Sequence, residues 1–325
     1  MRNICIRADG STEIGLGHLT RCIALAQILR KNFKITFFCK SIPDKIAGEL
    51  SKNGFEFIVI AEESSFLETL TERDIIIIDG YSFDTTYQKR IKITGSKLVC
   101  IDDTYDQEFV ADLIINHSPG IKVTDYKARK YTRFALGLEY ALLRPPFLTQ
   151  ATIPRKIDKI NSVLICFGGS DYENLTERTL NIVLSFSEFK RIVVVTGFAY
   201  IFTNSLIQRA QSDQRVTHYH SIDENEMCSL MRESDLAIVP ASSIIIEALS
   251  QKMIVISGYY VENQEKAYST ILKTKLIFGV DDFSNFSEKI LEDKLSDIKK
   301  VIAKGKLINA DVGSDKLLDV FKSLI

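Results

Sequence analysis

One feature near the start of the sequence most constrains the fold. It is a short apolar strand followed by a glycine-rich turn and an amphipathic helix. Residues 3–8 predict a buried strand, and Gly15 and Gly17 predict a sharp turn that brings backbone N–H groups close to a ligand. The apolar residues after the turn recur at the three- and four-residue spacing of one helical face: Leu19, Cys22, Ile23, Ala26 and Leu29. This order is typical of the first unit of a parallel α/β sheet.

His18 directly follows Gly17, in the first turn of the predicted helix. Unpaired N–H groups and the positive end of the helix dipole favour an anion there, and the carboxyl end of a strand is where α/β folds bind ligands. The dinucleotide fingerprint is incomplete because no third glycine follows Gly17 three positions on, and the phosphate-loop Gly-Lys-Ser/Thr is missing. On this stretch alone, a ligand site and a purely structural turn are both open.

The composition limits the class of protein. A chain of 325 residues, 46% of them hydrophobic and 26% charged, can form two globular domains. Its net charge of −1 produces no field that attracts nucleic acid or an acidic membrane. The six cysteines lie far apart without a C-x-x-C pair, which favours buried thiols in a reducing cytoplasm. Without a signal peptide or a membrane-spanning run, we expect a cytoplasmic protein with no membrane or nucleic-acid partner.

The strand and helix pattern occurs twice along the chain. The apolar run at 74–79 predicts a strand covered on both faces. Residues 150–161 lack apolar periodicity and indicate a linker, after which the pattern restarts with a strand at 162–167. We therefore expect an α/β protein of two Rossmann-like, doubly wound parallel-sheet domains, residues 1–150 and 151–325, that face each other across a cleft.

Two turns in the second half could hold phosphate. Gly168-Gly169-Ser170-Asp171 combines close backbone approach with polar side chains, and Asn174 starts the next helix. Ser242 and Ser243 precede another helix, whose N–H groups and hydroxyls suit a diphosphate. Glu247 lies one helical turn later on the same face, where a carboxylate could accept both ribose hydroxyl protons. Each feature alone is more often explained by a structural role than by ligand binding. Together, in two matched halves of the chain, they favour nucleotide binding.

The acidic and histidine residues do not predict a metal site. The acidic clusters match no calcium loop: Asp79, Asp102, Asp103, Asp106, Asp281 and Asp282. The four histidines lack partners four residues apart: His18, His117, His218 and His220. We therefore expect neither a metal nor another cofactor.

At these residues the chain resembles a known family, the UDP-sugar hydrolases of pseudaminic acid biosynthesis. That family cleaves UDP-2,4-diacetamido-2,4,6-trideoxy-β-L-altropyranose and is similar in fold to the GT-B glycosyltransferases. The matching segments span most of the chain in the expected order: 7–9, 15–22, 79–81, 101–103, 137–145, 167–171 with Asn174, 242–243 with Glu247, and 262–264.

The resemblance implies roles for particular residues. His18 matches a catalytic histidine that activates water, and Glu247 matches an acidic residue that holds the ribose. Ser170, Asn174 and Ser243 match positions that contact the phosphates or ribose of UDP. Asn263 matches a polar residue at the sugar end of the cleft. The remaining substrate-binding candidates lie in the matching turns: Gly15, Gly17, Asp79, Tyr81, Gly169, Asp171, Ser242 and Gln264.

Three positions depart from the family pattern. Gly80 stands where the family often has His, Tyr172 stands where it often has Pro, and the residues at 241–244 replace its usual Gly-Ser-Thr-Thr. These changes concern the sugar more than the nucleotide. The exact stereochemistry and N-acyl pattern of the sugar, and the oligomeric state, are left open.

The resemblance therefore implies a GT-B-like, metal-independent hydrolase with a small-molecule UDP-sugar substrate. Water activated by His18 would attack the anomeric carbon and release UDP and the free sugar, inverting that centre. Two alternatives are open. A GT-B glycosyltransferase would use His18 to activate an acceptor hydroxyl, and a non-catalytic protein would only bind the nucleotide-sugar.

Overall fold

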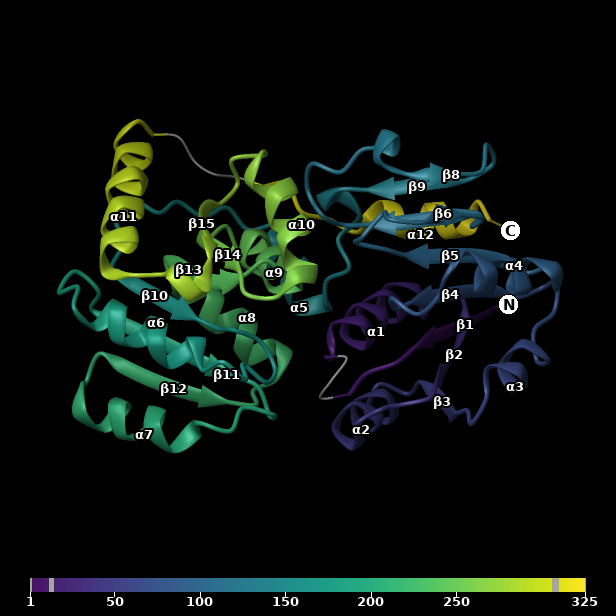
Figure 1. Ribbon diagram of the computed structural model, residues 1–325, viewed down its shortest axis with the longest axis horizontal. Coiled ribbons are helices and arrows are strands. Elements are labelled where there is room, and N and C mark those ends of the chain that lie inside the picture. Colours follow the sequence, from purple (N-terminus) through teal and green to yellow (C-terminus); the bar gives the residue numbers. More distant parts are fainter. Residues whose placement is uncertain (1, 12–14, 306–309, 325) are drawn as a thin grey trace. The chain divides into compact units, whose positions relative to one another are not determined.

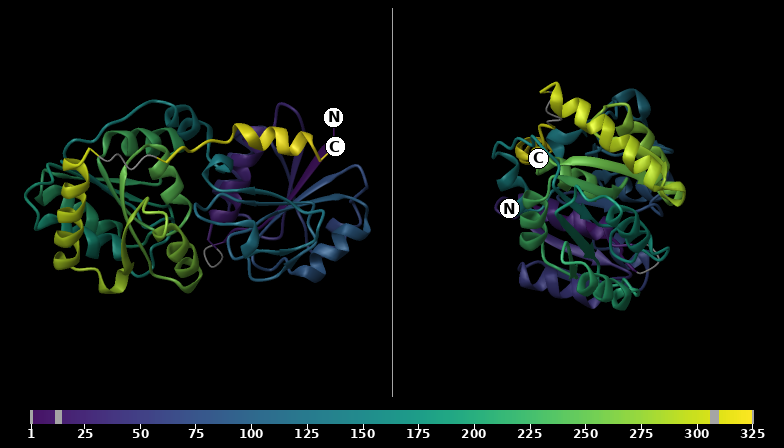
Figure 2. Two further views of the ribbon diagram at one scale, coloured as in Figure 1. Left: turned by 90° about the horizontal axis from the view of Figure 1, so that it is seen from above. Right: turned by 90° about the vertical axis from the view of Figure 1, so that its left-hand side faces the viewer.

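The chain folds into two compact α/β units, drawn in Figures 1 and 2. The computed structural model describes residues 2–11, 15–305 and 310–324, except for the side chain of Asn263. Unit 1 comprises residues 1–145 and 313–325, and unit 2 comprises residues 146–312. The expected boundary at 150/151 thus lies at 145/146. The end of the chain, expected in the second domain, instead completes the first.

Unit 1 is built on a seven-stranded, all-parallel sheet in the order β3-β2-β1-β4-β5-β7-β9. Its strands are β1 (Asn3–Ala8), β2 (Lys34–Cys39), β3 (Glu56–Val59), β4 (Ile75–Asp79), β5 (Lys97–Ile101), β7 (Leu113–Asn116) and β9 (Arg133–Leu136). A separate pair joins β6 (Glu108–Phe109) to β8 (Lys127–Ala128). The helices are α1 (Gly17–Leu29), α2 (Asp44–Lys52), α3 (Glu63–Leu67), α4 (Thr85–Ile93) and α12 (Asp315–Lys322), with short turns η1 (Val123–Asp125) and η2 (Leu138–Tyr140).

Strand β4 shows why this sheet is covered on both faces. All of its residues are buried, and alternate isoleucines point into different apolar cores. Ile75 and Ile77 join the core that also contains Leu19 of α1 and Phe321 of α12. Ile76 and Ile78 join the core on the other face. Because α12 contributes to a core of unit 1, the C-terminal helix returns to this unit.

Unit 2 repeats this arrangement with a six-stranded parallel sheet in the order β12-β11-β10-β13-β14-β15. Its strands are β10 (Ser162–Ile165), β11 (Arg191–Thr196), β12 (Val216–His220), β13 (Leu236–Pro240), β14 (Ile254–Tyr259) and β15 (Phe278–Asp282). Its helices are α6 (Leu175–Leu184), α7 (Thr203–Ser212), α8 (Glu224–Glu233), α9 (Ser243–Ser250), α10 (Glu262–Leu272) and α11 (Glu288–Ala303). Helix α5 (Pro145–Ala151) lies at the boundary between the units, and η3 (Phe283–Asn285) precedes α11.

Two elements of unit 2 differ from the sequence expectation. Residues 262–264, expected in a polar loop, are the first residues of α10. The negative charges of Glu262 and Glu265 in the first turn stabilise the helix through the positive end of its dipole. Strand β15 was not expected, since its sequence Phe-Gly-Val-Asp-Asp contains few apolar residues. Strands and helices alternate along the chain and form two parallel sheets, which confirms the expected α/β fold class. No helix within the described ranges is long and apolar enough to cross a membrane.

Candidate active site

The turn between β1 and α1 has the tight geometry that its glycines predict. Gly15 has a φ of +84°, which is accessible mainly to glycine, and its N–H donates to the Ser11 carbonyl at 2.9 Å. Helix α1 begins at Gly17, and Leu16 at the N-cap provides no side-chain cap. Among the described residues, no side chain caps the first-turn N–H groups, as an anion site requires.

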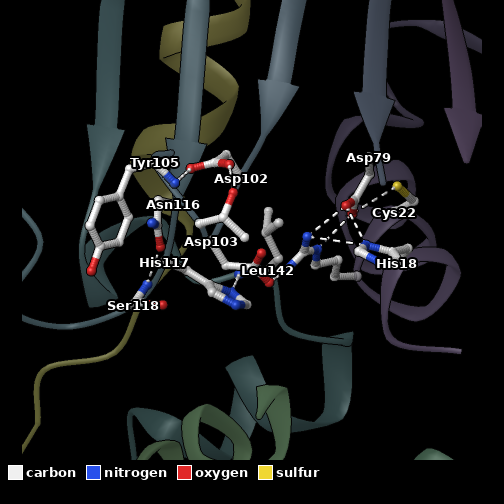
Figure 3. Close-up of polar contacts among 12 residues, drawn as sticks. His18, Cys22, Asp79, Asp102, Asp103, Tyr105, Asn116, His117, Ser118 and Leu142 are labelled. Carbon is white, nitrogen blue, oxygen red and sulfur yellow. Dashed lines mark hydrogen bonds and ion pairs between the residues drawn. The ribbon is translucent and has the colours of Figure 1, made fainter. Parts of the chain in front are cut away.

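His18 lies in the first turn of α1 against the end of β4 (Figure 3). Strand β4 runs beside β1, with Asp79 opposite Ala8, so its last side chain reaches the start of α1. His18 Nδ1 lies 2.7 Å from Asp79 Oδ1, and only 6% of the His18 surface is exposed. The imidazole is thus fixed in orientation by a fully buried carboxylate.

Arg21 holds the same carboxylate from the other side. Its Nε donates to Asp79 Oδ2 and its Nη2 donates to Asp79 Oδ1, both at 2.6 Å. Its Nη1 donates to Asp103 Oδ2 at 2.7 Å, so one guanidinium joins the ends of the neighbouring strands β4 and β5. A bidentate pair of this kind fixes both distance and angle.

The charges around Asp79 determine which nitrogen of His18 is free. Burial by itself raises the pKa of Asp79, but the charges and hydrogen bonds of Arg21 and then His18 hold that pKa well below its usual range. An ionised carboxylate only accepts hydrogen bonds, so Nδ1 of His18 carries the shared proton. Nε2 has no hydrogen-bonding partner among the described residues and keeps its lone pair.

Sequence reasoning did not name Arg21 or Asp103 as site residues. Arg21 lies three residues after His18 and therefore on the same helical face, which is a usable signal. Asp103 follows β5, next to the strand that carries Asp79. Only the sheet order shows that these two residues meet.

Tyr81 and Gly80 shape the surface beside the imidazole. The Tyr81 ring packs edge-on against His18, with 4.8 Å between ring centroids, and 54% of Tyr81 is exposed. Gly80 has a φ of +153°, and an added Cβ would lie 3.1 Å from the Phe83 ring. This backbone favours glycine at position 80, where the similar family often has histidine. The loop after β4 therefore presents Tyr81 rather than an imidazole.

Residues 7–9, part of the segments that carry the resemblance, have a structural role. Arg7 is 1% exposed and binds Glu63 through two nitrogens, at 2.7 and 3.1 Å. It also donates to Asp9 at 2.7 Å, and Asp9 accepts the backbone N–H groups of residues 40 and 41. This ion-pair network ties the end of β1 to α3 and to the end of β2.

In unit 2, the two turns predicted to hold phosphate follow neighbouring strands. β10 pairs with β13 in parallel, so the turn at 168–171 and the start of α9 lie at one edge of the sheet. Gly168 has a φ of +87°. A Cβ on Gly197 would come within 2.4 Å of Gly169 Cα, so the β11 turn packs closely against this one. Ser170 is part of the same turn.

Asp171 and Asn174 differ from the other members of this turn because their polar groups already have protein partners. Asp171 is 2% exposed and accepts the N–H groups of Leu175 at 2.9 Å and Thr176 at 2.8 Å. It therefore caps α6 and occupies N–H groups that a phosphate would need. The Asn174 amide donates to Glu177 at 2.7 Å and accepts from Tyr200 at 2.6 Å. We assign both residues to the framework of the turn, in place of the ligand contacts expected from the sequence.

The start of α9 is different, because no side chain in the described part of the chain accepts a hydrogen bond from its first N–H groups. Ser242 is the exposed N-cap residue, Ser243 is the first helical residue, and Glu247 follows one turn later. Cys166 directly follows β10 and leads into the glycine turn. Burial is the main cause that raises the pKa of Cys166 to about 12. A backbone hydrogen bond lowers this pKa, and the charges of Glu247 and Asp171 raise it further.

Asn263 and Gln264 lie in the first turn of α10. The side chain of Asn263 is outside the described residues. Gln264 Oε1 accepts the N–H of Tyr260 at 3.2 Å and so stabilises the turn between β14 and α10. Among the described residues, no three histidine, cysteine or acidic side chains gather as metal ligands.

The chain is similar in sequence to three curated proteins. No protein-family model matches the chain. It is 32% identical over 287 residues to the uncharacterized protein MJ1062 of Methanocaldococcus jannaschii, a match covering 83% of this chain and 58% of that longer protein. It is 28% identical to the UDP-2,4-diacetamido-2,4,6-trideoxy-beta-L-altropyranose hydrolase of Campylobacter jejuni, covering 83% of this chain and 96% of the relative. It is 25% identical to the spore coat polysaccharide biosynthesis protein SpsG of Bacillus subtilis, covering 76% and 74%.

The similar solved structures share the fold at low sequence identity. MurG of Acinetobacter baumannii superposes with a TM-score of 0.64 at 12% identity, covering 99% of both chains. HepE of Anabaena, solved with UDP-glucose, gives 0.62 at 12% identity, covering 100% and 99%. The glycosyltransferase WaaG gives 0.55 at 14% identity, covering 99% of both. The resemblance expected from the sequence is confirmed: the chain is similar over most of its length to the Campylobacter jejuni hydrolase and to SpsG. Its fold is the GT-B fold of the similar solved structures.

Proposed function

We propose that this chain is a UDP-sugar hydrolase that releases UDP and a free 2,4-diacetamido-2,4,6-trideoxy sugar, in pseudaminic acid-type biosynthesis. The observation that carries the proposal is the arrangement of His18. An ionised Asp79 holds its Nδ1 at 2.7 Å, and its Nε2 has no partner among the described residues. The substrate class follows from the name of the Campylobacter jejuni relative.

In the proposed reaction, His18 Nε2 takes a proton from a water molecule. The water oxygen bonds to the anomeric carbon, while the bond from that carbon to the UDP oxygen breaks and its electron pair leaves with UDP. Attack opposite the leaving group inverts the anomeric centre. Asp79 stabilises the imidazolium that forms, and Arg21 keeps Asp79 in place throughout.

Unit 2 would supply the nucleotide site. The open N-terminus of α9, with Ser242 and Ser243, and the glycine turn with Ser170 offer N–H and hydroxyl donors for the diphosphate. Glu247 would accept the ribose hydroxyls. These donors would balance the charge on departing UDP without a metal ion.

A second candidate, a GT-B glycosyltransferase, is favoured by the fold shared with WaaG. The same nucleotide site and His18 would then pass the sugar to an acceptor hydroxyl. One experiment separates the candidates. The protein is incubated with a panel of UDP-amino sugars, in excess chelator and without acceptor, and the anomeric products are followed by NMR.

We expect rapid release of free sugar with inverted configuration and no effect of the chelator. Release only after an acceptor is added would identify a transferase. Loss of activity in chelator that a divalent ion restores would contradict the metal-free mechanism. UDP binding without any release over hours would identify a non-catalytic binder.

A further inference from the structure

A second imidazole lies at the same edge of the unit 1 sheet as His18. His117 directly follows β7, and β4, β5 and β7 are consecutive in the sheet. The parallel strands therefore bring His117 to the edge that carries Asp79 and Asp103. Figure 3 shows both imidazoles beyond the strand ends. The mechanism above does not use His117.

The hydrogen bonds of His117 determine its tautomer. Its Nδ1 accepts the backbone N–H of Leu142 at 3.1 Å, so the proton of the neutral ring is on Nε2. Burial and the charge of Arg21 lower the pKa of His117 to about 4, although Asp103 and Asp79 oppose this shift. At neutral pH the ring is therefore uncharged, with its donor on Nε2.

That donor is available to a ligand. No residue in the described ranges accepts a hydrogen bond from His117 Nε2, and this nitrogen is not among the fully enclosed polar atoms that lack a partner. A permanently unused donor in a 6% exposed side chain is costly unless water or a ligand satisfies it.

The loop that carries His117 is held rigidly. Asn116 Oδ1 accepts the N–H of Ser118 at 2.9 Å, and the Asn116 amide donates to Tyr126 at 2.9 Å. Tyr126 in turn donates to Asp102 Oδ2 at 3.0 Å. These buried bonds fix the backbone on either side of His117, so its ring is positioned before any ligand binds.

We propose that His117 binds the sugar of the substrate, donating Nε2–H to an uncharged oxygen of that sugar, a hydroxyl or an amide carbonyl. The inference rests on the proposed UDP-sugar hydrolase function. The two imidazoles then have opposite roles. His18 presents a lone pair and takes the proton of water, whereas His117 presents a proton and orients the sugar. Because its ring is neutral, His117 supplies a hydrogen-bond donor without adding a positive charge to the site.

A matched pair of variants separates this role from a purely structural one. In His117→Asn, the side-chain oxygen can replace Nδ1 as acceptor for the Leu142 N–H, but the donor at Nε2 is lost. In His117→Gln, the longer amide keeps a donor near Nε2 and loses the acceptor for Leu142. Wild type and both variants are assayed for UDP release, and their thermal unfolding and UDP affinity are measured.

Binding of the sugar predicts that His117→Asn raises KM about five- to tenfold, the effect of one neutral hydrogen bond, with kcat changed less. The KM of His117→Gln should lie closer to the wild-type KM than that of His117→Asn does. The affinity of both variants for UDP should equal that of the wild type. A structural role predicts the reverse order, with His117→Asn close to wild type and His117→Gln impaired and less stable. That order, or wild-type KM in both variants, would overturn the inference while leaving the hydrolase proposal intact. Absence of UDP release by the wild type would instead refute both.

Testing the variants with and without an N-acyl group on the sugar identifies the acceptor. A KM increase confined to the N-acylated substrate indicates the amide carbonyl. The same increase with both substrates indicates a hydroxyl.

Discussion

The candidate sites of the two units are built from different kinds of polar groups at neighbouring strand ends. In unit 1, the ends of β4 and β5 carry ionisable side chains that bind α1, with Asp79 in contact with both His18 and Arg21. In unit 2, the ends of β10 and β13 lead into a glycine turn, into hydroxyl side chains and into a helix start whose N-cap residue makes no side-chain cap. Both units are parallel sheets covered by helices. One topology can thus carry the proposed proton transfer in one unit and the proposed anion binding in the other, and the residues in the turns make the difference.

The helix starts of unit 2 show the same contrast at smaller scale. Asp171 caps α6 and occupies its first N–H groups, so that helix start is closed to an anion. Helix α9 has no such cap. The proposed diphosphate site is therefore at the start of α9, and the hydrogen bonds of Asp171 belong to the framework of the turn. Four predictions test this division of roles.

The largest effect is expected from His18→Asn. The amide cannot take a proton from water, so turnover should fall by about 10³-fold or more. UDP affinity, measured by calorimetry, should be almost unchanged because the proposed nucleotide site lies in unit 2. Unchanged turnover in the purified variant would remove His18 from the catalytic role.

Asp79→Asn should reduce kcat by about 100-fold, because the neutral amide no longer fixes the Nδ1–H tautomer or stabilises the imidazolium. The variant also loses acid-dependent stability. In the wild type, the depressed pKa of Asp79 contributes stability that is present above the ordinary carboxyl pKa and lost as the pH falls through the lower folded-state value. Acid unfolding of the wild type and of Asp79→Asn measures how much of the free energy of unfolding each protein loses as the pH falls. A variant with wild-type kcat would show that Asp79 only supports the fold.

Glu247→Gln should weaken UDP binding by about tenfold, since a carboxylate that accepts two ribose hydroxyls is replaced by an amide. The kcat with saturating substrate should change little. Deoxyuridine diphosphate provides the control: it lacks one ribose hydroxyl, so the variant should lose less affinity for it than for UDP. Equal losses for both ligands would contradict a ribose contact.

Asp171→Ala should lower the free energy of unfolding by about 1 to 2 kcal/mol, the usual effect of losing a helix N-cap. Chemical denaturation measures this loss. At a temperature where the variant is folded, its UDP affinity should stay within about threefold of wild type. A much larger loss of affinity with little loss of stability would place Asp171 in direct contact with the ligand.

Much of the architecture was predictable from local pattern. The apolar run ending at Asp79 and the helical spacing after His18 depend only on neighbouring residues, so the strand and the helix were found close to their observed bounds. Strand β15 and the start of α10 were missed because their sequences are mainly polar. Strand β15 depends on its pairing with β14 rather than on local apolar periodicity. The start of α10 is marked by acidic first-turn residues, which apolar periodicity does not detect.

The site was predictable only in part. The sequence singles out His18 because it follows a glycine turn, and the polar tip after β4 singles out Asp79. It does not show that Arg21 joins Asp79 to Asp103, because that contact depends on β4 and β5 being neighbours in the sheet. The cap made by Asp171 is by contrast a local contact, with N–H groups four and five residues later, but the sequence does not show whether Asp171 or Ser170 beside it makes this contact.

The sequence by itself determined the alternation of strands and helices, the two glycine turns and the histidine placed at a helix start, because these follow from short-range periodicity and backbone preference. Only the tertiary structure decided that the last helix returns to the first unit and that Arg21 clamps Asp79. It also decided that His18 and His117 carry their protons on opposite nitrogens. A tautomer depends on which donor or acceptor lies across the space between strands, and residues distant in the chain supply those partners.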